Sequence, residues 1–372
     1  MSKKDRTING VLRKKEKIKM KKTSPEFIEK TNNLLQKKIP LFYFLLLLIL
    51  IAAGTYLLTK ASVTEKLKAG ILAEDAPGYN IKRLPGYKLI SPLLAAKPAE
   101  ESILYSGIKE KAASIIGEMK DKGVLIGASV YMRDFDKANW MNVNGLDKFA
   151  PGSIFKIPVL LTILKMEEEK PGLLNERLTF RTTYPVDKSQ NFVSKGIELG
   201  NSYTVKELLE YMIIHSDNNA GLLLSERMDK KILLRIFNDL NIKAPDSRNP
   251  AYPITARECS RFLEVLFNAT YLSPRNSEFA MELLSKTLFK EGIVKGLPDK
   301  NPIIAHKFGE AGSDINRQLH ETALLFINEK PYLLTIMTMG KDNVPFSELA
   351  KVIQNLAKTV YEGIEELNTP GA

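Results

Sequence analysis

The sequence is poor in cysteine and histidine, which excludes two common ways of stabilising or equipping a fold. Cys259 is the single cysteine among 372 residues, so the chain can form no internal disulfide. The three histidines, His215, His306 and His320, show no metal-ligand spacing with it or with one another. We therefore expect neither a metal nor a cofactor. Cys259 lies within the helical pattern TARECSRFLEVL, and we interpret it as a buried structural thiol.

A basic face of the kind that binds nucleic acid is also missing. The formal net charge is +11, but residues 1–38 contain 13 Lys or Arg and 4 Asp or Glu, a net charge of +9. This leaves +2 for the other 334 residues. Aromatic residues do not interleave with the basic tail as a single-strand binder requires. The charge therefore marks a tail, and we do not expect nucleic acid as a partner.

A long apolar run follows the tail directly. Residues 39–59, IPLFYFLLLLILIAAGTYLLT, contain no charged residue and can cross about 30 Å of hydrocarbon as a helix. A cleaved signal peptide would have an apolar region of about 7–15 residues and a small-residue cleavage site, and neither fits. The basic residues before the run predict a cytoplasmic N-terminus. We expect a single-pass protein of the cell membrane, with its remaining residues outside the cytoplasm.

The rest of the chain divides into a linker and one folded domain. Residues 60–100 contain scattered proline and glycine without a sustained period, which is typical of a linker. The domain is expected over 101–370. Hydrophobic periodicity predicts strands at 124–134, 139–145, 302–308, 320–329 and 331–340. It predicts helices at 102–119, 153–168, 204–215, 219–228, 229–240, 255–271, 276–289 and 345–366, two of which begin with capping boxes, Thr204 to Glu207 and Thr255 to Glu258.

The predicted strands come at both ends of the domain. Such groups usually pair into one sheet, because each group alone is too small to be stable. The expected fold is α+β, with an antiparallel sheet of about five strands flanked by helices, an all-helical subdomain beside it, and one transmembrane helix before it. A cleft should lie where the two parts meet, and we expect a monomer.

The stretch PGSIFKIPVL, residues 151–160, places a lysine inside an apolar run. Serine is a weak nucleophile unless a base removes its proton. A lysine can act as that base when desolvation or a second cation lowers its pKa. If Ser153 begins a helix, Lys156 lies one turn further on the same face. The pair is not specific, because the same spacing recurs at Ser106 and Lys109, and Lys156 could be a surface lysine with a buried stem.

Two further motifs follow in order. Ser216-Asp217-Asn218 ends a helical run, and Lys307-Phe308-Gly309 lies on a predicted strand. Taken alone, the first could be a helix terminus and the second could contain an edge-strand lysine. The order S-x-x-K, S-D-N and K-[TS]-G resembles the class A serine β-lactamases and the related penicillin-binding proteins. The resemblance covers roughly 103–368 and implies the α/β sandwich of the β-lactamase and transpeptidase type.

The resemblance implies a role for each residue at a matching position. Ser153 would be the acylated nucleophile, and Lys156 its general base or proton relay. Ser216 would pass a proton to the leaving nitrogen, and Asn218 would hold Lys156 and the substrate amide. Lys307 would supply positive potential to the substrate carboxylate and to the proton network.

Three more residues, Gly309, Glu310 and Arg317, would bind the substrate. The backbone N–H group of Glu310, which follows Gly309, would form an oxyanion hole together with that of Ser153. Arg317 is a candidate second clamp on a carboxylate, although an arginine in an exposed salt bridge fits the sequence equally well.

The sequence departs from the family pattern at three places. Class A β-lactamases carry a glutamate between S-D-N and K-T-G that activates the hydrolytic water. The corresponding loop, 239–255, contains only Asp239 and Asp246 as acids, and Asp246 is the candidate substitute. Phe308 replaces a threonine or serine, and Glu310 places an acid beside the oxyanion position. Without a poised base, acylation could proceed while deacylation stalls.

These observations leave three functions open. The first is a membrane-anchored serine hydrolase of the class A β-lactamase type, acting on a β-lactam or a related amide. The second is a penicillin-binding protein-like D,D-peptidase or transpeptidase that acts on cell-wall peptides. The third is an inactive, anchored module that binds cell-wall peptide.

Overall fold

A computed structural model of the chain describes residues 82–83, 86–95, 101–182, 191–192, 194–245, 252–298, 303–312 and 316–368. The chain divides into two units, 1–73 and 74–372, and all described residues belong to the second. The basic tail and the expected transmembrane helix at 39–59 therefore lie outside the described residues. Within the described ranges, no helix is long and apolar enough to cross a membrane.

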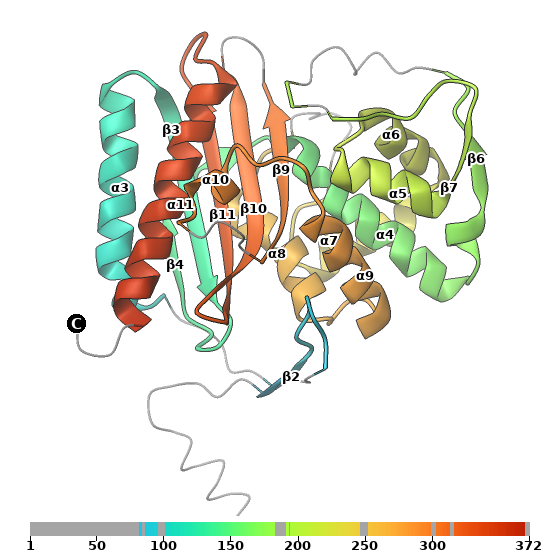
Figure 1. The fold of residues 1–372 in the computed structure, drawn as a ribbon, viewed down its shortest axis with the longest axis horizontal. Coiled ribbons are helices and arrows are strands. Elements are labelled where there is room, and N and C mark those ends of the chain that lie inside the picture. Colours follow the sequence, from blue (N-terminus) through green and yellow to red (C-terminus); the bar gives the residue numbers. More distant parts are fainter. Residues whose placement is uncertain are drawn as a thin grey trace, which may run out of the picture. The chain divides into compact units, whose positions relative to one another are not determined.

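One five-stranded antiparallel sheet organises the domain (Figure 1). Its strands lie in the order β4-β3-β11-β10-β9, so the two groups of predicted strands do pair, and the predicted α+β fold is confirmed. The strands are β3 (Leu125–Asp134), β4 (Trp140–Val143), β9 (Ile304–Ala311), β10 (Gln318–Ile327) and β11 (Lys330–Gly340). β9 is an edge strand of this sheet, and it carries Lys307 and contacts the segment that contains Ser153.

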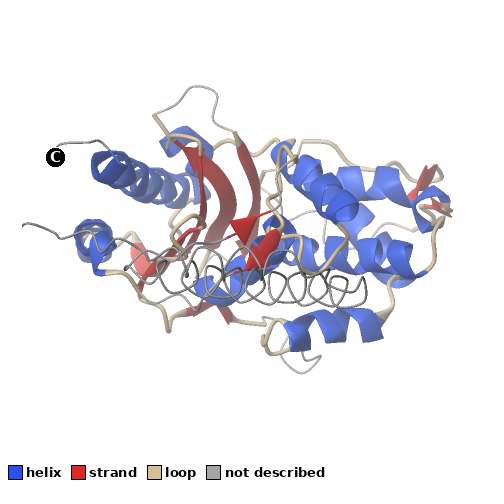
Figure 2. Ribbon diagram, turned by 90° about the horizontal axis from the view of Figure 1, so that it is seen from below, coloured by secondary structure: helices blue, strands red, loops and turns tan. Residues whose placement is uncertain are grey.

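Helices cover both faces of the sheet (Figure 2). α3 (Ser106–Asp121) and α11 (Phe346–Asn368) pack against each other and on one face, whereas α8 (Ala256–Phe267) contacts the other. Each face has its own cluster of buried apolar side chains. Because both faces are covered, the central strands β3, β10 and β11 are buried along nearly their whole length rather than on alternate residues.

Most of the remaining helices form a separate group beside the edge strand β9 (Figure 1). They are α4 (Lys156–Glu169), α5 (Val205–Ile214), α6 (Asn218–Arg227), α7 (Lys230–Asp239) and α9 (Pro274–Ser285). The short α10 (Ile293–Gly296) packs against α11 instead. The capping boxes predicted at Thr204 and Thr255 are confirmed. Cys259 is fully buried in α8, and burial raises the pKa of its thiol to about 12, which fits a structural role.

Several predicted boundaries were wrong. β9 continues to Ala311 because its pairing with β10 extends to Gln318, so Gly309 and Glu310 belong to the strand. The helix predicted over 255–271 ends at Phe267, and Ala269 nearby adopts a left-handed backbone conformation with φ of 49°.

Short strand pairs were missed because two or three residues give no measurable period. They are β1 (Lys82–Arg83) with β2 (Leu93–Ala95), β5 (Lys148–Phe149) with β8 (Ile254–Thr255), and β6 (Arg177–Thr179) with β7 (Ser202–Thr204). Within the expected linker, Leu89 and Ile90 are buried in the core cluster that includes α8.

Two glycines let the segment before α4 lie directly against β9. Gly152 has φ of 56°, and a Cβ there would lie within 3.0 Å of three backbone atoms of Glu310. A Cβ on Gly309 would overlap the carbonyl oxygen of Pro151. The contact is therefore backbone against backbone, and it fixes where α4 begins relative to the edge of the sheet.

We predict that Gly309→Ala lowers the free energy of unfolding by about 2 kcal/mol, because the added methyl group must push the Pro151 segment away from β9. Chemical denaturation followed by the fluorescence of Trp140, the single tryptophan, measures this change. Gly107→Ala is the control, since a Cβ there meets no atom within 4 Å and alanine favours the helix. Equal stability of Gly309→Ala and the unmodified chain would contradict the backbone contact.

Candidate active site

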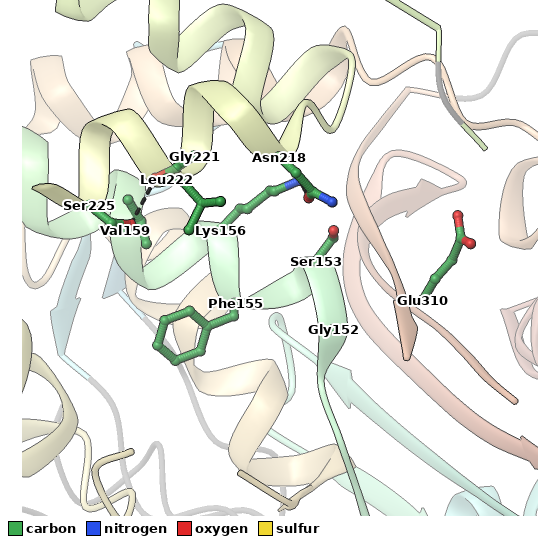
Figure 3. Close-up of a pocket in the computed structure, with 10 residues that line it drawn as sticks. All are labelled: Gly152, Ser153, Phe155, Lys156, Val159, Asn218, Gly221, Leu222, Ser225 and Glu310. Atoms are coloured by element: carbon green, nitrogen blue, oxygen red, sulfur yellow. Dashed lines mark hydrogen bonds between the residues drawn. The ribbon is translucent and has the colours of Figure 1, made fainter. Parts of the chain in front are cut away.

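Ser153 lies in a short 3-10 turn, η2 (Gly152–Phe155), that leads into α4. The helix predicted over 153–168 thus begins as a tighter turn, with its α-helical part starting at Lys156. The turn lines a cleft of about 340 Å³ (Figure 3), and Figure 3 shows the Ser153 hydroxyl facing the same space as the Lys156 ammonium and the Asn218 amide. Ser153 is half-buried and lines the cleft, so its hydroxyl is accessible to a molecule bound there.

Lys156 is buried, with 8% of its surface exposed, inside the apolar wall made by α4. Its Nζ donates to the carbonyl oxygen of Ser216, to the Oγ of Ser216 at 3.3 Å and to the Oδ1 of Asn218 at 2.7 Å. An ammonium group can be buried only when such partners replace water. The S-D-N motif therefore explains why a lysine is tolerated in this apolar run.

Ser216 occupies a strained turn between α5 and α6. It is fully buried and has φ of 57°, an uncommon conformation for a residue with a side chain. Asp217 stabilises the turn, because its carboxylate caps α6 through the N–H of Asn219 at 2.9 Å and also accepts from the N–H of Ile197 at 2.9 Å. These two hydrogen bonds hold the turn in its left-handed conformation. This conformation directs the Ser216 side chain toward the two lysines.

Lys307, on β9, is the second buried ammonium group and has no exposed surface. Its Nζ donates to the Oγ of Ser216 at 2.8 Å and to the carbonyl oxygen of Phe308 at 3.2 Å. Burial holds the pKa of Lys307 well below its usual range, and the charge of Lys156 adds to this effect, whereas Glu310 and Glu321 oppose it. One hydroxyl oxygen therefore accepts hydrogen bonds from two lysines, a geometry suited to moving a proton.

Phe308 and Glu310 flank Gly309 on β9. The ring of Phe308 is buried and stacks on the ring of Phe289, with 4.2 Å between the ring centroids. The centroid of the Phe308 ring lies 4.3 Å from the Nζ of Lys307. The carboxylate of Glu310 accepts three hydrogen bonds from Asn191 and Phe192, and Figure 3 shows it directed away from Ser153. The acid beside the oxyanion position is thus held by donors and does not face the nucleophile.

Arg317 does not join the residues that line the cleft. Its Nη1 donates to the carbonyl oxygen of Val344 at 3.5 Å, and its guanidinium carbon lies 5.8 Å from the centre of the Phe346 ring. The other S-x-x-K spacing, at Ser106 and Lys109, falls on α3, where Lys109 pairs with Glu101 at the surface. Context therefore separates the two copies of that motif.

Sequence reasoning missed the apolar wall of the cleft and the segment bound to Glu310. The wall consists of Phe155 and Val159 on the nucleophile side and of Leu222 on α6. The helical period of α4 and α6 could have placed these side chains beside Lys156. Asn191 and Phe192 carry no motif, and nothing in the sequence connects them to a strand more than 110 residues later.

Residues 109–364 match the sequence model of the beta-lactamase enzyme family. This chain belongs to that family. Beta-lactamase VEB-1 of Pseudomonas aeruginosa is 22% identical over an alignment of 262 residues, and the match covers 65% of this chain and 86% of the relative. The extended-spectrum beta-lactamase PER-1 of the same organism is 22% identical over an alignment of 275 residues, and the match covers 68% of this chain and 86% of the relative.

Solved structures support the family fold. The structure of PBP-A has a TM-score of 0.59 and 20% identity, and it covers 73% of this chain and 99% of its own. A variant of PBP-A with the same score has been solved as an acyl-enzyme complex with penicillin G. A class A beta-lactamase from Mycobacterium abscessus has a TM-score of 0.57 at 18% identity, with 69% of this chain and 99% of its own covered.

Of the two acids in the 239–255 loop, only Asp239 is among the described residues, and it does not line the cleft. Asp239 ends α7 and accepts a hydrogen bond from the hydroxyl of Tyr271 at 3.0 Å. Asp246, the candidate substitute for the family glutamate, lies outside the described residues. Among the described residues that line the cleft, Glu310 is the one carboxylate, and Asn191 and Phe192 already bind it.

We predict that Lys307→Met flattens the pH dependence of stability. With its pKa lowered, folded Lys307 loses its proton at a lower pH than the unfolded chain does, so the unfolded state holds more protons between the two pKa values. Stability of the unmodified chain therefore rises with pH across that window, up to the ordinary lysine pKa of about 10.4. Melting temperatures between pH 7 and pH 10 measure this slope.

Lys351→Met is the matched control, because Lys351 is exposed and pairs with Glu348 on α11. It should leave the slope unchanged. An equally steep rise in Lys307→Met would show that Lys307 does not carry the depressed pKa.

Proposed function

We propose that the chain is a membrane-anchored serine hydrolase of the β-lactamase type, in which a β-lactam or a related amide acylates Ser153 and water then releases the acyl group. The observation that carries this proposal is the pair of buried lysines, Lys156 and Lys307, bound to the Oγ of Ser216 beside the cleft. Membership of the beta-lactamase enzyme family supports a reaction in which a serine is acylated.

Acylation begins when Lys156, in its neutral form, takes the proton of the Ser153 hydroxyl. The serine oxygen attacks the carbonyl carbon, and the C–N bond of the amide breaks as the tetrahedral intermediate collapses. The leaving nitrogen receives the hydroxyl proton of Ser216, and Lys156 passes the proton that it took from Ser153 on to Ser216. Lys307, which is bound to the same oxygen, holds Ser216 in place during this transfer. Asn218 holds Lys156 in position through its Oδ1 and directs its own amide toward the substrate.

The oxyanion that forms needs donors. We assign these to the backbone N–H groups of Ser153 and Glu310, which the close approach of Gly152 to Glu310 supports. Removing one such donor typically costs about 100–1000-fold in rate. The Glu310 carboxylate does not oppose this charge directly, because it faces Asn191 and Phe192.

Deacylation is the slower half of the proposed reaction. A water molecule that attacks the acyl-enzyme needs a base, and a positioned base typically contributes about 10²–10⁴ in rate. Asp239 is bound to Tyr271, and the described part of the cleft offers no second carboxylate. This same observation favours a second candidate, a penicillin-binding protein-like peptidase or transpeptidase on cell-wall peptides; in the transpeptidase an amine attacks the acyl-enzyme in place of water.

The anchor belongs to the proposal as well. The uncharged run at 39–59, with 13 basic residues before it, supports a single transmembrane helix with a cytoplasmic N-terminus. The catalytic domain would then lie outside the cytoplasm, where β-lactams and cell-wall peptides are accessible.

We predict that a fluorescent penicillin labels the full chain covalently and that Ser153→Ala abolishes the label. We further predict turnover of a chromogenic cephalosporin about 10²–10⁴-fold below that of an enzyme with a poised base, because the acyl-enzyme accumulates. Gel fluorescence measures the label, and absorbance measures the turnover. Ser106→Ala is the control, since it removes the serine of the surface S-x-x-K copy and should change neither result.

Each outcome separates the candidate functions. Slow turnover supports the hydrolase, whereas a stable label without turnover supports the peptidase or transpeptidase. No label that depends on Ser153 would exclude both and leave the inactive binding module.

We predict that the full chain resists alkaline extraction from membranes and that protease added outside the cell removes the catalytic domain. Leu46→Arg with Leu48→Arg should weaken insertion, because each arginine at the centre of a helix costs about 2.5–3.5 kcal/mol. Quantitative fractionation checks this result. Complete extraction of the unmodified chain would contradict the anchor.

A further inference from the structure

The two cations that the family resemblance assigns to a substrate carboxylate both face aromatic rings. Lys307 has no exposed surface, and the centre of the Phe308 ring lies 4.3 Å from its Nζ. The guanidinium carbon of Arg317 lies 5.8 Å from the centre of the Phe346 ring. Aromatic faces attract cations and repel anions, so these surroundings do not suit a carboxylate.

The rings belong to one aromatic cluster, formed by Phe192, Phe289, Phe308 and Phe346. Phe192 makes edge-to-face contacts with the other three at centroid distances of 5.0, 6.1 and 6.5 Å. Phe289 stacks on Phe308 with an interplanar angle of 19°. Phe192 therefore connects the ring beside Lys307 to the ring beside Arg317.

Glu310 anchors Phe192 at this position. Its carboxylate accepts hydrogen bonds from the backbone N–H of Asn191 at 2.9 Å, from the side-chain amide of Asn191 at 3.0 Å and from the backbone N–H of Phe192 at 3.1 Å. Hydrogen bonds to an ionised carboxylate are stronger than those between neutral groups. The departures from the family motif at Phe308 and Glu310 thus take part in one assembly.

We propose that this assembly closes the carboxylate end of the cleft and makes substrate recognition independent of a carboxylate. Lys307 then acts on Ser216 alone, and the preferred substrates are lactams or acyl amides that carry a neutral group at that end. Phe308 determines this specificity by covering Lys307, and Glu310 and Phe192 are positioning residues. The inference rests on the proposed acylation of Ser153.

A matched pair of substrates tests the proposal. Benzylpenicillin and its methyl ester differ in the carboxylate alone, so their acylation rates on the full chain measure its contribution. We expect the two rates to agree within about threefold, since a closed end makes no charge-assisted hydrogen bond to the acid. Phe308→Thr should restore access to Lys307 and favour the acid by about ten- to hundredfold.

Phe192→Ala provides a second variant should Phe308→Thr not fold. It removes the ring that supports Phe308 without altering β9 or either oxyanion donor, and it should also shift the preference toward the acid. Glu348→Gln, which changes a surface acid on α11, should leave the two rates equal. A tenfold or greater preference of the unmodified chain for the acid would overturn the proposal, as would equal rates in every folded variant.

Amide hydrogen exchange tests, without any substrate, whether Glu310 holds Asn191 and Phe192 in place. In Glu310→Gln, the amides of Asn191 and Phe192 should exchange about tenfold faster, because an amide group cannot accept all three hydrogen bonds. The amide of Ile197, which donates to Asp217, is the internal control and should not change. Unchanged exchange at Asn191 and Phe192 would overturn the role of Glu310.

The two proposals fail in different ways. If neither penicillin acylates Ser153 in the unmodified chain, the proposed function is wrong. Hydrogen exchange still shows whether Glu310 holds Asn191 and Phe192. If both acylate it with a strong preference for the acid, the proposed function holds and the carboxylate-independent specificity is wrong.

Discussion

The hydroxyl oxygen of Ser216 accepts hydrogen bonds from two buried ammonium groups, and the other features of the site follow from this arrangement. A hydroxyl oxygen has two lone pairs, one for each lysine. Bringing two like charges together away from water is unfavourable unless each has further partners. Lys156 has the Oδ1 of Asn218 and the carbonyl oxygen of Ser216, while Lys307 has the carbonyl oxygen and the ring of Phe308.

The backbone around Ser216 is arranged for the same purpose. A left-handed conformation at a serine is unfavourable, so the turn persists only because its neighbours hold it. Asp217 does this twice, as the cap of α6 and as the acceptor for Ile197. On the opposite side, Gly152 and Gly309 remove the two side chains that would separate η2 from β9. These contacts thus position both Ser153 and the Ser216 hydroxyl that the two lysines share.

Much of the fold followed from patterns that are local in the sequence. Helical periodicity and capping boxes located α5 and α8, and strands at both ends of the domain predicted a single sheet. The order of three motifs predicted which residues would meet, although the Ser153 pair alone could not be separated from the pair at Ser106 and Lys109. The 3-10 turn at Ser153 was not predicted, because a serine three residues before a lysine is compatible with either type of helix.

Contacts between distant segments could not be predicted. From the sequence, Glu310 is expected to place an unfavourable charge near an oxyanion. In the structure its carboxylate accepts hydrogen bonds from residues 191 and 192, which carry no motif. At Phe308 the sequence shows only that a family hydroxyl is missing, whereas its ring packs with the rings of Phe192 and Phe289 from separate parts of the chain. Both residues can be interpreted only once their partners are known.

The position of β9 at the edge of the sheet has a consequence for association. An active site built on an edge strand must keep part of that edge free of a neighbouring strand, and such an edge is a ready template for pairing with another chain. The contact between Glu310 and the Asn191–Phe192 segment lies at the half-buried end of this edge strand. A side chain that holds a loop there also shortens the stretch of β9 on which a second molecule could add a strand, so the same few hydrogen bonds that hold this loop also protect the edge.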